Sequence, residues 1–408
     1  LLGDGRAMVL GEHITPNRER FDIQLKGSGQ TPFSRRGDGR ATLGSMLREY
    51  IFSEAMAGLG IPSTRSLAVV ETGEKIMREK VAPGAVLTRV ATSHVRVGTF
   101  EFAAASGGAP AVKALADYAI ERHFPELSAR KNPISAFLKT VIDRQAQLVA
   151  RWVLAGFIHG VMNTDNMTIS GETIDYGPCA FMNTWNPGTV FSSIDYDGRY
   201  AYGNQPLMAQ WNLARLAETL LPLLNPDEAT ALKMAHEAID SFTELYQKYW
   251  LQGMLARLGL KNRHENDLKL INGLFSLMKK HHLDYTATLR TLTLAVVHTY
   301  PPVNLAELSD FPDWYLAWQI RLEQETALDR QWQMIDVQNL MLAANPACIA
   351  RNHLVEMVIE KAVEQKNYSP LTEFLSVLKD PFAPKYDYAD NQIPPEGFDD
   401  NYKTFCGT

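Results

Sequence analysis

The sequence predicts an α+β fold, in which a small sheet with one helix precedes a long helical region. Apolar and polar residues alternate from Phe21 to Lys26, which is typical of a half-buried strand with Lys26 on its wetter face. Apolar residues recur at helical spacing from 42 to 59, and glycines end that pattern before Pro62. Beyond residue 205 almost every segment has the same helical spacing.

Length and composition exclude several classes of protein. A chain of 408 residues is long enough for two or three domains. The hydrophobic share of 46% and the charged share of 21% are those of an average globular protein, which excludes disordered and fibrous classes. The net charge of −6 argues against nucleic acid as a partner.

The cysteines and the apolar runs indicate where the protein works. Cys179, Cys348 and Cys406 form neither a CxxC pair nor an array at zinc spacing, which predicts a reducing compartment without structural zinc. No apolar run approaches the roughly 20 residues of a membrane span, and no leader pattern opens the chain. We therefore expect a cytoplasmic protein with no membrane partner. Because the chain starts at Leu1 without Met, we also expect that an N-terminal piece precedes it.

The first lobe contains three features that could bind phosphate. Gly3-Asp-Gly5-Arg6 is a glycine turn whose amides could cradle a phosphate, although a plain turn has the same pattern. Lys26 leaves its strand beside glycines and could hold a phosphate, or it could be a solvated strand lysine. Glu49 lies at the border of the apolar stripe of the 42–59 helix, from which it could reach Lys26.

Two further strands are predicted near residues 66–70 and 86–90. Arg89 and Arg96 lie on either side of a short Ser/Thr-rich segment, Thr92-Ser-His94. Two arginines in such a segment could clamp phosphates, although surface ion pairs explain most arginines.

The stretch from His159 to Pro178 predicts a small hairpin, with strands at 167–169 and 173–174. Paired strands lie roughly 5 Å apart, so Asn166 at the entrance and Asp175 at the exit should face one point. Mg²⁺ takes few protein oxygens and completes its shell with water and phosphates, so this pair suits a metal–nucleotide site. A surface hairpin with Asn and Asp at turn positions is the alternative.

Changes of pattern along the chain predict four parts. A sheet lobe ends near residue 108, where helical patterns at 111–122 and 134–156 begin. The predicted parts are residues 1–108, a second lobe at 109–205, a helical region at 206–380 and an irregular tail at 381–408.

The order of these features is that of the protein kinases: a strand lysine, a helix glutamate, a loop with Asp and Asn, and a metal-binding Asp-Phe-Gly. Over nearly its whole length the sequence resembles one particular family, selenoprotein O. The motifs that carry the resemblance are Leu2-Gly-Asp-Gly-Arg6-Ala, Leu25-Lys-Gly-Ser-Gly29, Arg48-Glu-Tyr, the stretches 88–100 and 159–166, and Asp175-Tyr-Gly-Pro.

The resemblance implies a protein-kinase-like two-lobed fold with a large helical C-terminal region. It also implies a protein adenylyltransferase that binds ATP in an orientation flipped relative to kinases. Lys26, held by Glu49, would bind phosphates, and Arg89 and Arg96 would grip the terminal one. The other implied nucleotide contacts are Gly3, Gly5, Arg6, Asp38, Gly39 and Asp175.

The resemblance also implies how AMP is transferred. Asn166 and Asp175 would ligate Mg²⁺ or Mn²⁺, and Asp165 would accept the proton of a Ser, Thr or Tyr hydroxyl on a protein, self-modification included. Two departures leave alternatives open. Val161 stands where kinases place the catalytic Asp, so Asp165 could act as an orienting residue, and Cys406 lacks the partner of a C-terminal redox pair.

Three other activities stay open at this point: transfer of UMP from UTP, transfer of the γ-phosphate as a kinase, and a pseudokinase scaffold that binds nucleotide without catalysis. The doubly clamped γ-phosphate favours AMP transfer, since it makes that end the leaving group.

Overall fold

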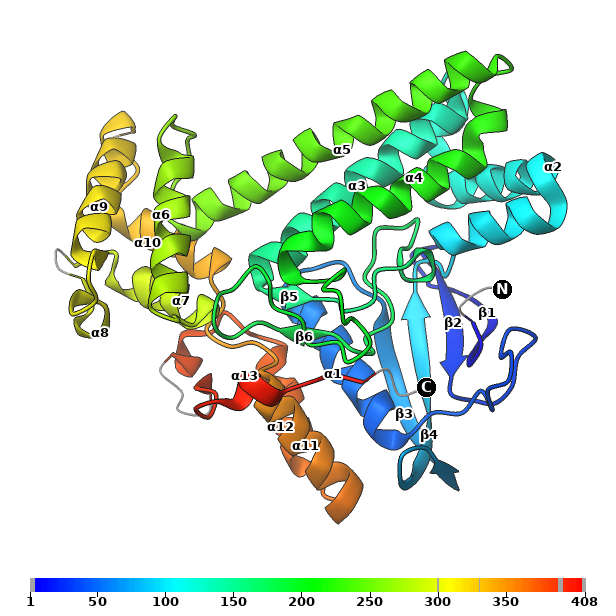
Figure 1. The fold of residues 1–408 in the computed structure, drawn as a ribbon, viewed down its shortest axis with the longest axis horizontal. Coiled ribbons are helices and arrows are strands. Elements are labelled where there is room, and N and C mark those ends of the chain that lie inside the picture. The colour runs from blue at the N-terminus through cyan, green and yellow to red at the C-terminus, as the bar shows by residue number, and fades with distance from the viewer. Residues whose placement is uncertain (1–3, 299–300, 330, 388–391, 406–408) are drawn as a thin grey trace.

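The computed structural model describes residues 4–298, 301–329, 331–387 and 392–405. A small sheet lies beside long helices, with a further helical group at one end of the molecule (Figure 1). The predicted α+β class is confirmed. Gly3 and Cys406 lie outside the described residues.

The main sheet has four antiparallel strands in the order β1-β2-β4-β3. Helix α1, Leu43–Gly58, packs against β3 and β4. The strands are β1 (Ala7–Ile14), β2 (Arg20–Lys26), β3 (Arg65–Met77) and β4 (Val81–Ala91).

The buried face of β2 is the opposite of the one predicted. Asp22, Gln24 and Lys26 are buried, whereas Phe21 and the other apolar residues of the strand are only half-buried. The alternation of residues correctly predicts a strand. The polar side chains can be buried because each has a charged or amide partner. Lys26 is therefore not a solvated strand lysine.

Helix α2, Val97–His123, runs across the boundary expected near residue 108. It is kinked there, because Gly108 has a φ of 61° and Pro110 follows. Helix α3, Pro133–Ala155, packs along both α4, Gln205–Leu224, and α5, Glu228–Arg257 (Figure 1).

The remaining helices divide between two places. Helices α6 to α10 contribute to a second hydrophobic core, which they share with residues of α3, α5, β5 (Phe157–Ile158) and β6 (Ala180–Phe181). Helices α11 and α12 return to pack on α1. Helix α12 lies within the helical region predicted at 206–380. The bounds are α6 (Asp267–Lys280), α7 (Tyr285–Ala295), α8 (Val303–Ala306), α9 (Phe311–Leu328), α10 (Met334–Ala344), α11 (Asn352–Gln365), α12 (Ser369–Leu378) and α13 (Phe398–Asn401).

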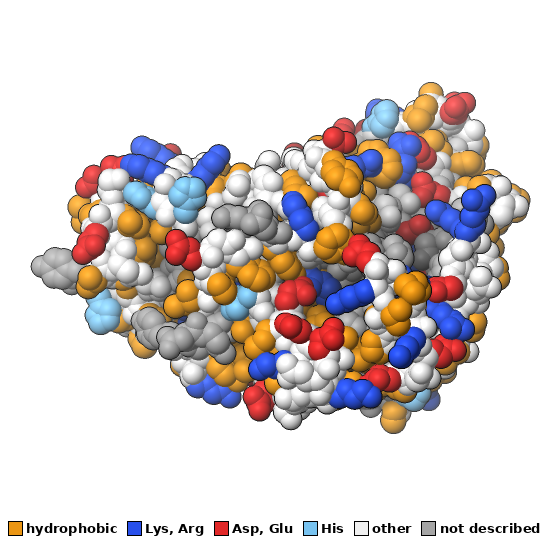
Figure 2. Space-filling model, turned by 60° about the horizontal axis from the view of Figure 1, so that its bottom comes forward, with side chains coloured by type: hydrophobic (Ala, Val, Ile, Leu, Met, Phe, Trp, Pro, Cys, Tyr) orange, Lys and Arg blue, Asp and Glu red, His pale blue; other side chains and the backbone are white. Residues whose placement is uncertain are grey.

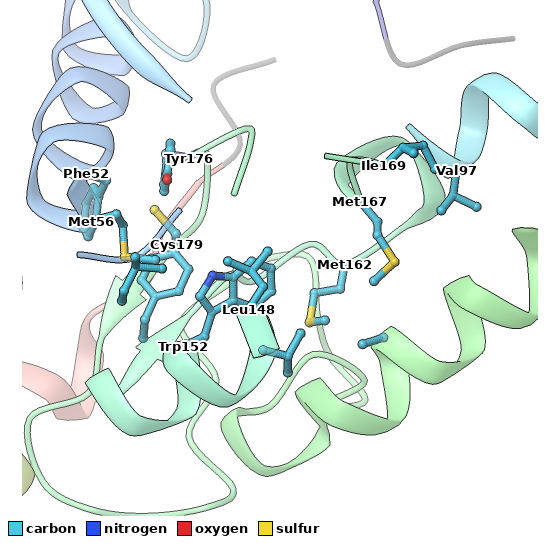
Figure 3. Close-up of a cluster of buried hydrophobic side chains, with 14 of the residues drawn as sticks. Phe52, Met56, Val97, Leu148, Trp152, Met162, Met167, Ile169, Tyr176 and Cys179 are labelled. Carbon is cyan, nitrogen blue, oxygen red and sulfur yellow. The ribbon is translucent and has the colours of Figure 1, made fainter. Parts of the chain in front are cut away.

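The largest core joins the sheet and α1 to α3 and to the loop 159–179 that follows α3. Figure 3 shows part of it, in which Phe52 of α1 and Trp152 of α3 lie near Tyr176 and Cys179. The short pair β5 (Phe157–Ile158) and β6 (Ala180–Phe181) closes the ends of this loop. Among the described residues, no helix combines the length and apolar character needed to cross a membrane.

Candidate functional site

A cavity of about 330 Å³ lies between the sheet and the segment 161–178. Acidic and basic side chains lie next to one another near the middle of the face shown in Figure 2. Most of the predicted site residues line the cavity: Gly5, Arg6, Lys26, Asp38, Gly39, Arg89, Asp165, Asn166 and Asp175. Residues far apart in the sequence therefore meet at one place.

Four charged side chains form a group that we call the site cluster: Lys26, Arg89 and Asp175, which line the cavity, and Glu49, which lies behind them. Lys26 Nζ lies 2.6 Å from Glu49 Oε2 and 2.5 Å from Asp175 Oδ1. Arg89 donates from Nε to Glu49 Oε1 at 3.0 Å and from Nη2 to both Glu49 and Asp175. The expected reach of Glu49 to Lys26 is present.

The site cluster holds its two carboxylates ionised. Burial opposes ionisation of Asp175, but the charges of Lys26 and Arg89 outweigh burial and keep the pKa of this carboxyl well below its usual value. The pKa of the Glu49 carboxyl is lowered against burial in the same way, by Arg89 and Lys26. An entering phosphate would therefore compete with two carboxylates for the same two cations.

The predicted hairpin between Asn166 and Asp175 is not present. Its two strands do not pair with each other, because each finds a backbone partner elsewhere: Thr168 bridges to Arg96 and Thr173 bridges to Ser63. The Thr168 hydroxyl donates to Glu172 O at 2.6 Å and closes the turn. Asn166 and Asp175 nevertheless line the same cavity.

The backbone at Asp175 is fixed by its neighbours. Asp175 has a φ of 65°, in the left-handed region that non-glycine residues rarely adopt. Before it, buried His159 donates from Nε2 to Ile174 O at 2.8 Å, and burial lowers the pKa of this imidazole, which keeps it neutral. After it, the hydroxyl of buried Tyr176 bonds to Ser63.

Asp165 and Asn166 lie on a 3₁₀ turn, Thr164–Asn166, capped by Asn163. Asn166 Nδ2 donates to Val161 O at 2.9 Å, which leaves the amide oxygen available as a ligand. Asp165 lies against the start of α2, where a Cβ added to Gly98 would come within 2.4 Å of Asp165 Oδ1. A side chain at position 98 would push this carboxylate out of its present place.

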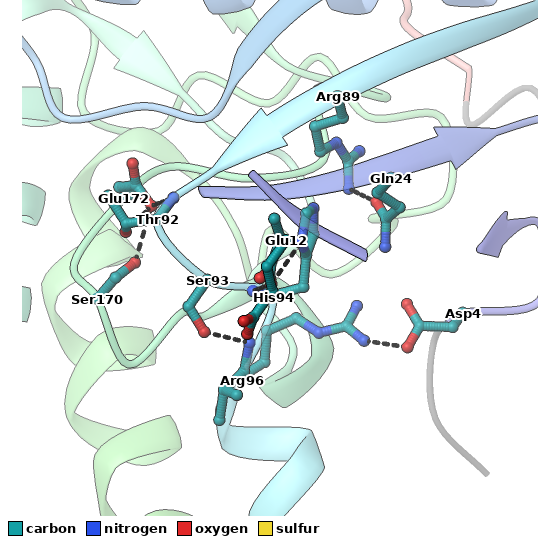
Figure 4. Close-up of polar contacts among 12 residues, drawn as sticks. Asp4, Glu12, Gln24, Arg89, Thr92, Ser93, His94, Arg96, Ser170 and Glu172 are labelled. Atoms are coloured by element: carbon teal, nitrogen blue, oxygen red, sulfur yellow. Dashed lines mark hydrogen bonds and ion pairs between the residues drawn. The ribbon is translucent and has the colours of Figure 1, made fainter. Parts of the chain in front are cut away.

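Arg96 is not among the residues that line the cavity. Its side chain is 2% exposed, and its Nη2 donates to Asp4 Oδ2 at 2.6 Å (Figure 4). Asp4 lines the cavity in its place. The sequence reasoning missed Asp4 because a Gly-Asp-Gly turn does not indicate which cation its carboxylate will contact.

Asp38 and Gly39 form one wall of the cavity. Arg78, which was not predicted as a site residue, makes two hydrogen bonds to the Asp38 carboxylate and lowers its pKa to about 2. Gly39 has a φ of 67°, and a Cβ there would lie 1.9 Å from Gly29 O. Gln24 was also missed: it accepts from Arg89 at 3.0 Å, and its place two residues before Lys26 on one strand face was the available signal.

The donor set fits a metal that keeps part of its shell for substrate. In the described ranges no three His, Cys, Asp or Glu side chains are grouped to hold a metal ion. Asn166 and Asp175 offer an amide oxygen and a carboxylate on one cavity wall. Mg²⁺ is bound in just this way at many nucleotide sites, with one or two protein oxygens and several from phosphate and water.

Comparison with known proteins agrees with the sequence-based resemblance. The family model for protein adenylyltransferase SelO matches residues 1–379. A protein nucleotidyltransferase YdiU of Bacillus cereus (strain G9842) is 56% identical over 409 residues, which are 100% of this chain and 82% of that protein. Proteins of the same name from Halalkalibacterium halodurans and Brevibacillus brevis are also 56% identical, with the same coverage.

The match extends over the whole chain and therefore spans every segment that contributes to the cavity. The sequence-based assignments to the selenoprotein O family and to the nucleotidyltransferases are confirmed at the level of the family. The chain therefore belongs to the protein adenylyltransferase SelO family.

Proposed function

We propose that this protein transfers AMP from ATP to Ser, Thr or Tyr hydroxyls of proteins, itself included. The observation that carries the proposal is the convergence of Lys26, Arg89, Asp165, Asn166 and Asp175 on one cavity. We interpret the sheet with α1 as the first lobe of a kinase-like fold, and the segment 159–178 with the long helices as the second.

The cations favour ATP bound with its terminal phosphate inward. Lys26 and Arg89 lie at the floor of the cavity, paired to Glu49 behind them. A phosphate held by both would be the leaving end, so the α-phosphate would face the open side. Arg96 would also contact this phosphate once Asp4 has moved away from its guanidinium.

Asn166 and Asp175 would hold Mg²⁺ or Mn²⁺, which supplies charge neutralisation on the phosphates when bound. Asp165 would accept the proton of the attacking hydroxyl. The hydroxyl oxygen forms a bond to the α-phosphorus as the bond to the bridging oxygen of the β-phosphate breaks, and pyrophosphate leaves. Such an in-line displacement needs positioning and charge more than covalent chemistry from the protein.

The test uses ATP radiolabelled at either the α- or the γ-phosphate, with Mg²⁺ or Mn²⁺, and counts label on the protein and on a cell lysate. We expect label from the α-position alone. Label from the γ-position alone would make the protein a kinase, and ATP binding without label would make it a scaffold. A parallel reaction with α-labelled UTP measures the preference between AMP and UMP.

A further inference from the structure

Arg48 connects the helix of the site cluster to the segment that follows Asp175. It precedes Glu49 on α1, and it donates from Nε to Gly177 O at 3.1 Å and from Nη2 to Cys179 O at 2.6 Å. Its Nη1 donates to Glu356 Oε1 of α11 at 2.8 Å. One guanidinium therefore binds two carbonyls immediately beyond the site and a carboxylate from the C-terminal part of the chain.

The C-terminal segment, residues 402–404, also contacts Glu356 and the segment 177–179. The Tyr402 hydroxyl donates to Glu356 Oε1 at 2.7 Å, the atom that Arg48 also contacts. The Thr404 hydroxyl donates to Pro178 O at 2.7 Å, and its backbone N–H donates to Phe191 O at 2.8 Å. Three consecutive carbonyls after Tyr176 are thus hydrogen-bonded by side chains of α1 and of the C-terminal segment.

These residues also form a wall next to the site cluster. A second cavity, of about 630 Å³, is lined by Lys26, Glu49 and Gly177 together with Tyr402 and Thr404. The C-terminal segment therefore lies directly behind the proposed phosphate site, although it is more than two hundred residues away in sequence.

We propose that Arg48, Tyr402 and Thr404 form a clamp that positions Asp175 for the metal, a role that rests on the proposed function. Gly177 is two residues from Asp175, whose left-handed backbone persists only while its surroundings hold it. The clamp fixes the carbonyls at 177–179, and buried Tyr176 transmits that constraint to Asp175.

Arg48 and Thr404 are buried, but the contact between Tyr402 and Glu356 is open to solvent, which argues against a purely stabilising role for the Tyr402 hydroxyl. The Glu356 side chain is 47% exposed, and ion pairs that open to solvent contribute little to folding. Loss of the Tyr402 hydroxyl should therefore change the unfolding temperature little. It should change the geometry of Asp175 much more, because outer contacts that orient a metal ligand typically affect metal affinity about 10–100-fold.

The test compares Tyr402→Phe, Thr404→Val and the double variant with Tyr368→Phe. Tyr368 is the matched control, since its hydroxyl also joins the C-terminal region to a glutamate, Glu71 of β3, away from residues 177–179. Calorimetry would measure the affinity for Mn²⁺–ATP and for ATP in EDTA. We expect the double variant to bind Mn²⁺–ATP about 10–100-fold more weakly, with metal-free ATP affinity unchanged. The unfolding temperature should stay unchanged in Tyr402→Phe and fall in Thr404→Val, which leaves the buried Pro178 O without its donor.

Three outcomes would overturn the clamp: unchanged Mn²⁺–ATP affinity in the double variant, an equal loss of metal-free ATP affinity, or the same loss in Tyr368→Phe. Glu356→Gln keeps an acceptor for Arg48 and Tyr402 and should retain most of the metal-dependent affinity. Because these readouts are binding constants, they stand even if wild-type protein transfers no AMP, which would contradict the proposed function alone.

Discussion

Two clusters of buried charge in this protein are built for different purposes. The site cluster consists of Lys26, Glu49, Arg89 and Asp175. The second, which we call the helical cluster, lies between α6 and α9 and consists of Asp267, Arg321 and Glu325. Arg321 Nε lies 2.8 Å from Asp267 Oδ1, and its Nη1 lies 2.9 Å from Glu325 Oε2. Both clusters contain a buried arginine with two carboxylates.

Their other partners differ. In the helical cluster, Glu325 Oε1 accepts from the backbone N–H groups of Lys261 and Asn262, and Asp267 Oδ2 accepts from that of His264. In the described part of the chain, the hydrogen bonds of Glu49 and Asp175 side chains come from Lys26 and Arg89 side chains.

This difference separates a fixed structural site from an exchangeable one. Backbone donors cannot leave a carboxylate without unfolding the loop that carries them, so the helical cluster holds residues 261–267 onto α9. Side-chain donors can turn to a new acceptor, and Asp175 is 21% exposed toward the cavity. Lys26 and Arg89 can therefore exchange a carboxylate for a phosphate, and Asp175 can exchange its cationic partners for a metal ion.

The largest expected effect is on AMP transfer, in a variant of Asp165, which lines the same cavity as the site cluster. Asp165→Asn should lower the rate of AMP transfer about 10²–10⁴-fold, as loss of a general base does. Calorimetric ATP affinity and the free energy of unfolding should stay close to wild type, because Asp165 is outside the site cluster. Transfer at the wild-type rate would refute Asp165 as the base and make it an orienting residue.

The helical cluster should respond in the opposite way. Arg321→Ala leaves two buried carboxylates unpaired and should lower the free energy of unfolding by about 3–5 kcal/mol. Urea denaturation measures this, and AMP transfer per folded molecule should not change. A loss of transfer without a loss of stability would show that the two clusters are coupled.

Periodicity predicted most helices and strands correctly, since it depends on which residues are apolar. It could not reveal that β2 buries its polar face, because that burial depends on Arg89, Arg122 and other side chains distant in sequence. The hairpin prediction failed for the same reason: Thr168 and Thr173 find bridge partners in segments far from 167–174.

For the site, the sequence predicted the residues that carry charge but not their resting partners. Lys26, Arg89 and Asp175 were expected to face substrate, and their residue types indicated that. The ion pair of Asp4 with Arg96 and the hydrogen bond of Thr404 to Pro178 O depend on how the ends of the chain pack onto the rest of the fold. Local spacing contains no information on such contacts.

Acid should destabilise the protein through histidines whose imidazoles are held neutral in the fold. Burial lowers the pKa of His123, with a further contribution from Arg122, to about 4. A folded pKa below the unfolded value of about 6.5 gives stability that is present above pH ~6.5 and lost as pH falls toward ~4. The buried imidazoles of His94 and His159 have pKa values lowered in the same direction.

Each such histidine contributes up to about 1.4 kcal/mol per pH unit inside its window. His123→Gln should therefore flatten the acid limb of a plot of unfolding free energy against pH, measured by urea denaturation. An acid limb of unchanged slope in His123→Gln would contradict this account.

The smallest effect is expected where a charge pair is exposed, and it sharpens the contrast between the two buried clusters. Asp38 pairs with Arg78 at 2.8 Å, but its side chain is 45% exposed. Water and salt screen such a pair, so Asp38→Asn should cost no more than about 1 kcal/mol of unfolding free energy, and less in high salt.

The effect of Arg321→Ala should hardly depend on salt, since its partners are buried. Urea denaturation at low and high salt measures both; a large, salt-independent loss in Asp38→Asn would place this pair with the helical cluster as a structural one.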